Sequence, residues 1–227
     1  MRPRQPREKL SRHSVIDAAL RLVDGGGLRR LTMRALADEL GAPPMTLYTH
    51  FAGKEQLLDH LFEGVIERLL ETERRPTWKQ DLEGACRHAR GVLLAHPHWV
   101  PLLARVTMPP PSLHFYDRLL EGMCRDGFAP DAAMHAFSTM LSFTLGEVLV
   151  ERMMSAHHQP PVPVQQLALV RDMVPKLPAG AFPGVDAALP VFGVWSFDAV
   201  FELGLCSLIK GLEANRATPP RAERHAL

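Results

Sequence analysis

Long uninterrupted apolar runs are missing from the sequence, although hydrophobic residues make up 46% of its 227 residues. Charged residues break every apolar stretch, whereas a membrane-spanning helix needs about 18 or more apolar residues in succession. The basic N-terminus MRPRQPREKL is followed by no apolar core, so it lacks the pattern of a secretory signal. We therefore expect a cytoplasmic protein without a membrane partner.

Cysteine is also scarce, with Cys86, Cys124 and Cys206 as the three examples. An odd number at wide spacing does not make a disulfide framework. Each cysteine lies in an apolar helical pattern, so we expect three buried thiols.

Catalytic signatures are absent. The chain has no Gly-x-Ser-x-Gly, no His-Glu-x-x-His and no glycine-rich phosphate loop. The run Gly25-Gly26-Gly27 lacks the Gly-Lys-Ser/Thr that would complete such a loop, and it instead indicates a helix stop. We expect neither an enzyme nor a cofactor.

Alternation of period two is missing as well, while apolar residues recur every three or four positions. This spacing predicts an all-α fold. The expected helices cover 14–23, 33–40, a short stretch from Pro44, 54–71, 78–94, 99–105, 113–125, 131–154 and 191–214. The proline-rich segment 157–190 is expected to be a long, partly mobile loop with one helix near 164–174.

Charge is distributed unevenly along the chain. Residues 1–54 hold ten Lys and Arg against five Asp and Glu, whereas the remaining residues hold sixteen against twenty. Such a split favours a small module that meets a polyanion, attached to a larger body that does not.

The segment GAPPMTLYTHF, residues 41–51, predicts a short helix, because proline suits a first helical turn. With the helix before it, this segment predicts a helix-turn-helix whose joint holds Leu36, Leu40, Leu47 and Phe51. Met45, Tyr48 and Thr49 are then expected to point outward together. A short helix without acidic residues can enter a DNA major groove.

The stretch LTMRALADELGAPPMTLYTHFAGKEQLL resembles the DNA-binding domain of the tetracycline-repressor (TetR) family of bacterial transcriptional regulators, and LSRHSVIDAALRLVDGGG resembles its first helix. PTWKQDL, FTLGEVLVE and FDAVFELGLCSLIKGLEA are similar to the regulatory domain of the tetracycline-repressor branch. The resemblance implies an N-terminal DNA-binding domain over 1–56, with a basic arm, and a ligand-binding and dimerisation domain over 57–227. It also implies a homodimeric repressor that binds a palindromic operator in double-stranded DNA and is released by a small-molecule inducer.

The resemblance also implies roles for single residues. Those expected at DNA bases are Arg34, Pro44, Met45 and Tyr48, with Thr49 beside them, and those expected at phosphates are Thr32, Thr46, His50 and Lys54. Candidate ligand-binding residues are His88, Trp99, Tyr116, Met123, Phe137, Met140, Leu141 and Thr144. Methionine and aromatic residues at helical spacing also fill ordinary helical cores, so this second set keeps that alternative.

The metal-binding positions of the tetracycline-responsive members are changed. By alignment, Thr107 stands in place of a histidine, and Val150 in place of a glutamate that helps to hold magnesium. We expect no metal site and a largely apolar inducer. A helical small-molecule-binding protein, or an activator without repressor activity, remains the alternative.

Two apolar helices, 131–154 and 191–214, are expected to form a twofold dimer interface. Small residues at Ala136, Gly146, Gly193 and Gly204 are expected to allow close helix approach, with Phe201 in the same interface.

Overall fold

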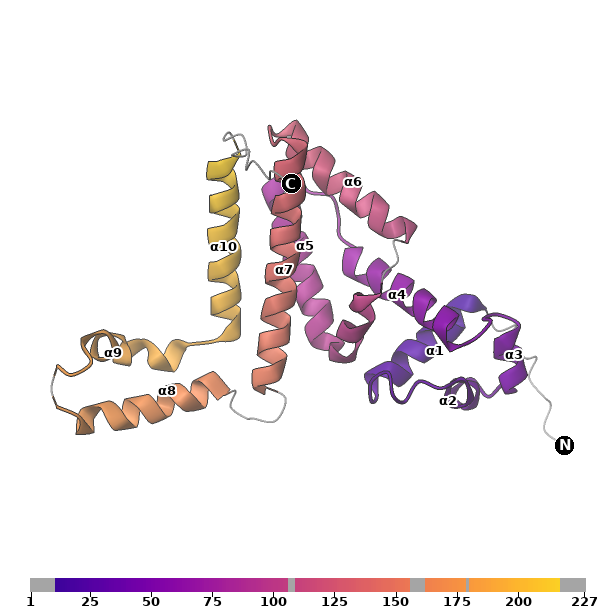
Figure 1. Ribbon diagram of the computed structural model, residues 1–227, viewed down its shortest axis with the longest axis horizontal. Helices are drawn as coiled ribbons and strands as arrows, with labels where there is room; N and C mark the ends of the chain where they lie inside the picture. Colours follow the sequence, from indigo (N-terminus) through magenta and orange to yellow (C-terminus); the bar gives the residue numbers. More distant parts are fainter. Residues whose placement is uncertain (1–10, 106–108, 156–161, 179, 217–227) are drawn as a thin grey trace, which may run out of the picture. The chain divides into compact units, whose positions relative to one another are not determined.

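The computed structural model describes residues 11–105, 109–155, 162–178 and 180–216 (Figure 1). All regular elements in these ranges are helices, which confirms the all-α prediction. They are α1 (Arg12–Asp24), α2 (Met33–Glu39), α3 (Pro44–Tyr48), α4 (Lys54–Leu70), α5 (Trp78–Ala95), η1 (Pro97–Ala104), α6 (Pro110–Arg125), α7 (Pro130–Ser155), α8 (Val162–Met173), η2 (Val174–Lys176), α9 (Pro183–Ala188), η3 (Leu189–Val194) and α10 (Phe197–Asn215), where η denotes a 3₁₀-helix.

The chain folds as two compact units. The first comprises the chain up to Thr72 together with Gly91–Asp117, and the second comprises Glu73–Arg90 together with the chain from Arg118 onward. Of the three boundaries between them, one lies between α4 and α5, and the other two fall inside α5 and α6. This division reflects packing, and the functional division after residue 56 stays a prediction.

Local signals define the first helices of the first unit. Ser11 and Ser14 form a reciprocal capping box at the start of α1. Thr32 caps α2 by accepting a hydrogen bond from the Ala35 amide at 3.0 Å, and Gly41, at φ +60°, follows its end. Pro44 occupies the first turn of α3, as predicted.

Helix α4 packs against both α1 and η1 within the first unit. Its buried side chains are Leu57, Leu58, Leu61, Phe62, Val65 and Leu69. Gly64 allows the close approach to α1, because a Cβ there would lie 3.1 Å from Cγ2 of Ile16. The broad apolar face of α4 is therefore buried on two sides.

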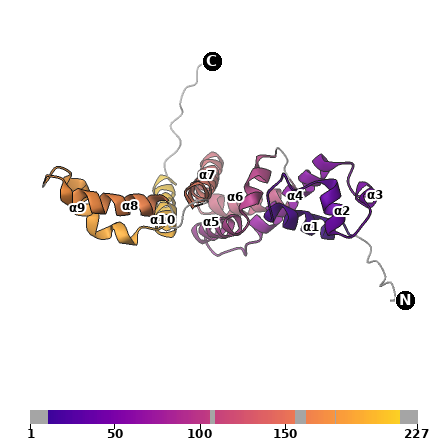
Figure 2. The same ribbon diagram turned by 90° about the horizontal axis from the view of Figure 1, so that it is seen from below.

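In the second unit, α7 and α10 lie side by side (Figure 1, Figure 2). The rings of Phe143 and Phe201 stack with centroids 5.5 Å apart. A Cβ at Gly204 would lie 2.6 Å from the Phe143 ring, so glycine is required for this contact. Gly204 thus allows α7 and α10 to approach closely, as expected, and Phe201 and Ala136 are buried within the same chain. The dimer interface itself stays a prediction.

The helix expected near 164–174 is confirmed as α8, but the loop expected after it was wrong, because the described residues of 174–190 form η2, α9 and the start of η3. Prolines stand in the first turns of these short helices, where no intrahelical amide donor is needed. The expected helix 191–214 is also interrupted. Ser196 caps α10 through the Ala199 amide, and α10 meets the preceding helical segment at 111°.

Two further expectations need correction. The segment 97–104 is a 3₁₀-helix rather than an α-helix, with Pro101 inside it, because proline cannot donate the α-helical hydrogen bond. Cys86 is buried, but Cys124 and Cys206 are exposed, because they lie on outward faces of α6 and α10.

Helix α7 has the length and mean hydropathy, 1.3, of a membrane-crossing helix. Charged residues within α7 interrupt its apolar runs, so the sequence pattern did not indicate it. Six buried side chains of α7, among them Met140 and Val148, pack in the helical unit, as expected for a core helix.

Candidate nucleic-acid interface and ligand-binding residues

Helix α3 has one buried face and one exposed face. Leu47 and Phe51 are buried, whereas Met45 is 73% exposed and Tyr48 is 49% exposed. Thr49 is exposed as well. Helix α3 packs against α2, and its exposed side presents Met45, Tyr48 and Thr49 outward, as the sequence predicted.

Hydrogen bonds to carbonyl groups of α3 fix the residues at its C-terminal end. Thr46 and His50 are half-buried, and Pro44 is exposed. The Thr49 hydroxyl donates to the Thr46 carbonyl at 2.7 Å, and the His50 amide donates to the Leu47 carbonyl. These bonds order the C-terminal end of α3. His50, which is half-buried, lies directly after the exposed Tyr48 and Thr49.

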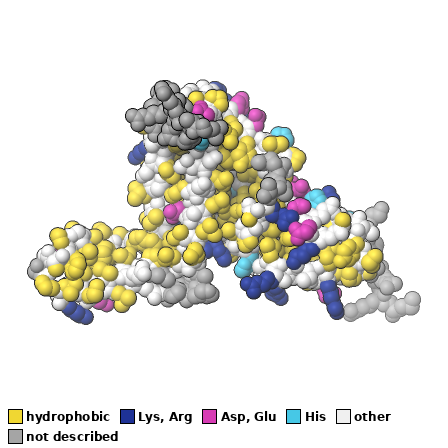
Figure 3. Space-filling view, viewed as in Figure 1, with side chains coloured by type: hydrophobic (Ala, Val, Ile, Leu, Met, Phe, Trp, Pro, Cys, Tyr) yellow, Lys and Arg dark blue, Asp and Glu magenta, His cyan; other side chains and the backbone are white. Residues whose placement is uncertain are grey.

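Cations of the first unit fall into two groups. Arg21, Arg68 and Arg105 form ion pairs with carboxylates of other elements. In contrast, the exposed Arg34 and Lys54 have no carboxylate partner among the described residues. Figure 3 shows Lys and Arg side chains gathered over the part of the molecule that holds α1 and α2. The unpaired group is available to an external anion.

Thr32 is exposed at the start of α2, and its oxygen already accepts the Ala35 amide. The hydroxyl proton can still be donated to a second acceptor, such as a phosphate oxygen. Lys54 begins α4, where helix amides also favour an anion. The structure thus brings the predicted DNA-contacting residues to α3 and to the starts of α2 and α4.

The predicted ligand residues are divided between the units. Met123, Phe137, Met140 and Thr144 are buried in the second unit, where Leu141 is 42% exposed and His88 is half-buried. Trp99 and Tyr116 belong to the first unit. Trp99 is buried there and stacks on His96 with ring centroids 3.9 Å apart.

Thr144, a polar residue among the buried ligand candidates, already forms a hydrogen bond within the chain. The Thr144 hydroxyl donates to the Met140 carbonyl at 2.8 Å. Burial raises the pKa of the neighbouring Cys86 thiol, which also hydrogen-bonds with Thr144. This thiol therefore stays neutral. The surroundings of Met123, Phe137, Met140 and Thr144 thus resemble an apolar helical core.

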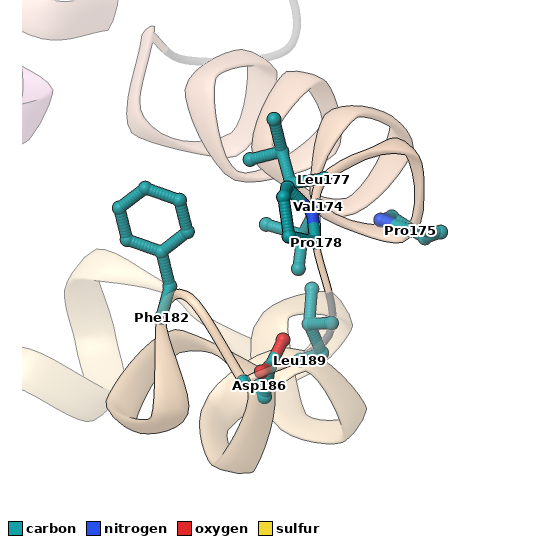
Figure 4. Close-up of a pocket in the computed structure, with 8 residues that line it drawn as sticks. Val174, Pro175, Leu177, Pro178, Phe182, Asp186 and Leu189 are labelled. Carbon is teal, nitrogen blue, oxygen red and sulfur yellow. The ribbon is translucent and has the colours of Figure 1, made fainter.

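A hollow of 320 Å³ lies elsewhere in the second unit, between the η2 region and α9 (Figure 4). Val174, Leu177, Phe182 and Leu189 contribute apolar side chains to it, and Asp186 is its acidic member. No predicted ligand residue lines this hollow. Sequence reasoning missed it because the segment was interpreted as a loop.

Two family domains match this chain. The domain described as "Bacterial regulatory proteins, tetR family" covers residues 15–61, and "Tetracyclin repressor-like, C-terminal domain" covers residues 72–216. The tetracycline repressor protein class C of Escherichia coli is 31% identical over 92% of this chain and 94% of its own. The class A protein from transposon 1721 is 32% identical over 92% of this chain and 93% of its own.

Solved structures agree with this result. ActR from Streptomyces coelicolor in complex with actinorhodin has a TM-score of 0.74 and 27% identity, over 92% of this chain and 98% of that one. A single-residue variant of TetR from Acinetobacter baumannii, in complex with minocycline, has a TM-score of 0.68 and 27% identity, over 92% of this chain and 100% of that one.

The fold and the exposed helix-turn-helix therefore define a DNA-binding transcriptional regulator. The chain belongs to the TetR family, and it is a ligand-responsive transcriptional repressor.

The metal-binding positions of the tetracycline-responsive members do not reappear here. Val150 is exposed on α7 and offers no oxygen ligand, and Thr107 lies outside the described residues. Among the described residues, no three His, Cys, Asp or Glu side chains are grouped to hold a metal ion. The side chain at position 150 thus does not fit a magnesium–drug complex.

Proposed function

We propose that the protein binds a palindromic operator as a homodimer, with one α3 helix in each half-site. The two-faced burial of α3 supports this most strongly, because its exposed face carries Met45, Tyr48 and Thr49 and no acidic residue. An anionic groove accepts such a face without charge repulsion. Residues 1–10 of the basic N-terminal arm lie outside the described residues.

Arg34, Pro44, Met45 and Tyr48 are the proposed base-contacting residues. The Arg34 guanidinium can bind guanine with two hydrogen bonds, and Met45 can pack on a thymine methyl group. Thr32, Thr46, His50 and Lys54 are the proposed phosphate contacts, which position the protein without reading sequence.

The dimer is proposed to form through the outward faces of α7 and α10. Exposed apolar side chains on these faces are Met134, Leu141, Leu149, Val150 and Met153 of α7 and Val200 and Leu203 of α10. Several exposed apolar side chains on neighbouring helices commonly mark a surface that another protein chain covers. A twofold axis would then separate the half-sites by about one helical turn, roughly 34–36 Å.

The inducer is proposed to be largely apolar and to bind without a metal. Buried Met123, Phe137 and Met140 support this in the second unit, since methionine adapts its shape to apolar ligands. Val150 supports the absence of metal, because it cannot ligate magnesium. We place the protein in the cytoplasm, where its DNA is found, without a membrane partner.

The proposal is tested by selecting duplexes from a randomised pool with the purified protein and then titrating the selected sequence. We expect a palindrome whose half-sites are one helical turn apart and one dimer bound per duplex. Failure to enrich any duplex would overturn operator binding, whereas enrichment of single half-sites by a monomer would overturn the dimer alone.

A further inference from the structure

The glycine run between α1 and α2 holds a single arginine side chain. Arg30 donates a hydrogen bond from Nη1 to the Gly25 carbonyl at 2.8 Å. A Cβ at Gly26 would lie only 2.0 Å from Cδ of Arg30, so the arginine lies where any other residue at 26 would place its side chain. The glycine run therefore does more than end a helix, because it also fixes Arg30.

The backbone of this turn is ordered by its own hydrogen bonds. The Gly27 amide donates to the Val23 carbonyl, and the Arg30 amide donates to the Gly27 carbonyl. Gly27 adopts φ +73°, which favours glycine. The next residue after Arg30, Leu31, is buried. The turn is thus anchored at both ends, and Arg29 and Arg30 occupy defined positions directly before the Thr32 cap of α2.

Both arginines are exposed, and neither forms an ion pair with a carboxylate in the described part of the chain. They share this property with Arg34 and Lys54, the two cations assigned to DNA above. Arg30 uses one of five guanidinium donors in its hydrogen bond to Gly25. Its other donors remain available to an anionic ligand.

We propose that Arg29 and Arg30 form a second phosphate-binding site for operator DNA, next to the site at Thr32 and supported by the Gly25–Gly27 turn. Three consecutive contacts would then follow one stretch of sugar-phosphate backbone. Guanidinium groups suit phosphate oxygens because they offer paired donors in one plane. The site adds affinity and salt dependence but reads no bases. This inference rests on the proposed operator binding.

The test measures operator affinity at several salt concentrations for Arg29→Ala and Arg30→Ala. Each phosphate contact contributes about 0.9 to the slope of log affinity against log salt, so each variant should lower it by about 1.8 per dimer. The ratio of operator to unrelated-DNA affinity should stay at the wild-type value. Arg125→Ala, an exposed arginine of α6 in the second unit, is the matched charge control.

Gly26→Ala tests the support for Arg30 while keeping both charges. It should weaken operator binding in the same direction, and adding it to Arg30→Ala should cause no further loss. Replacement of single phosphates by neutral methylphosphonates should weaken wild-type binding at one position or more and leave Arg30→Ala unaffected there. Thermal melting checks that each variant is folded.

Salt slopes equal to that of Arg125→Ala in both arginine variants would overturn the second phosphate site. So would a methylphosphonate profile that is identical in wild type and Arg30→Ala. If wild-type protein itself fails to bind any selected duplex, operator binding fails first and the inference with it.

Discussion

Arg105, at the end of η1, places Nη2 2.6 Å from Oδ1 of Asp59 on α4. The same guanidinium contacts Glu55, one turn earlier on α4. Lys54, a proposed phosphate contact, begins this helix. The pairing raises the pKa of Arg105 through its hydrogen bond to Asp59, so the charge on Arg105 is retained at all ordinary pH values. The end of η1 is thereby tied to the first turns of the helix that carries Lys54.

Loss of this connection is expected to weaken both stability and operator binding. Arg105→Ala should lower the free energy of unfolding by about 1 kcal/mol, the upper range for partly exposed ion pairs. Arg105→Lys should recover part of it, because one charge remains. Urea unfolding and operator titration measure the two effects. Unchanged operator affinity in Arg105→Ala would show that η1 does not position α4.

Leu203, 71% exposed on α10, provides the test of the dimer. Leu203→Glu should give a monomer by light scattering at micromolar concentration, because a charge would be buried in the interface. Leu113→Glu, at an exposed position of α6, is the matched control and should remain dimeric. Phe201→Glu should instead destabilise the chain itself, since Phe201 packs on Phe143. A dimeric Leu203→Glu would place the interface elsewhere.

Acid is expected to weaken the attachment of α10 to α5. Hydrogen bonds from Arg87 lower the pKa of Glu202. A carboxyl whose pKa is lowered by folding stabilises the protein above its unfolded pKa, and that stabilisation is lost as pH falls through the folded value. The stabilisation by the Arg87–Glu202 pair should therefore be fully present at neutral pH and should be lost below about pH 4.

Urea unfolding between about pH 3 and pH 7 checks this expectation. Glu202→Gln should flatten the acid limb of the curve, whereas Glu67→Gln, at an exposed position of α4, should leave it unchanged. An acid limb in Glu202→Gln as steep as in wild type would contradict the role of this pair.

Inducer release should not require a metal. We expect largely apolar compounds without chelating groups to release the selected operator equally well with EDTA or with magnesium. Tetracycline with magnesium should release little, because Val150 supplies no ligand oxygen. Release that depends on added magnesium would contradict the metal-free proposal.

Local sequence signals predicted the DNA-reading part of the fold well. Pro44 suits a helix start by its backbone alone, and the four-residue spacing of Leu47 and Phe51 determines which face of α3 is buried. Both features depend on neighbours within one or two turns. The burial of these residues accordingly matches the expectation.

Features that depend on distant residues were not predictable in the same way. The pairing of Arg105 with Asp59 joins residues 46 positions apart, and the packing of Gly204 on Phe143 becomes visible only when two helices meet. Prolines in 175–190 indicated a loop because a single sequence does not distinguish a helix-starting proline from a helix-breaking one. The support of Arg30 by Gly26 likewise required the folded turn.

The most direct test of the account is a titration of the selected operator and an unrelated duplex with wild type, Arg34→Ala, Tyr48→Ala and Lys54→Ala. Each base contact is worth about 1–3 kcal/mol of discrimination, so each of the first two variants should lose about 2–6 kcal/mol of discrimination per dimer while remaining folded. Lys54→Ala should weaken both duplexes alike and lower the salt slope by about 1.8 per dimer. Wild-type discrimination retained by Arg34→Ala and Tyr48→Ala would contradict the assignment of α2 and α3 as the elements that read the operator.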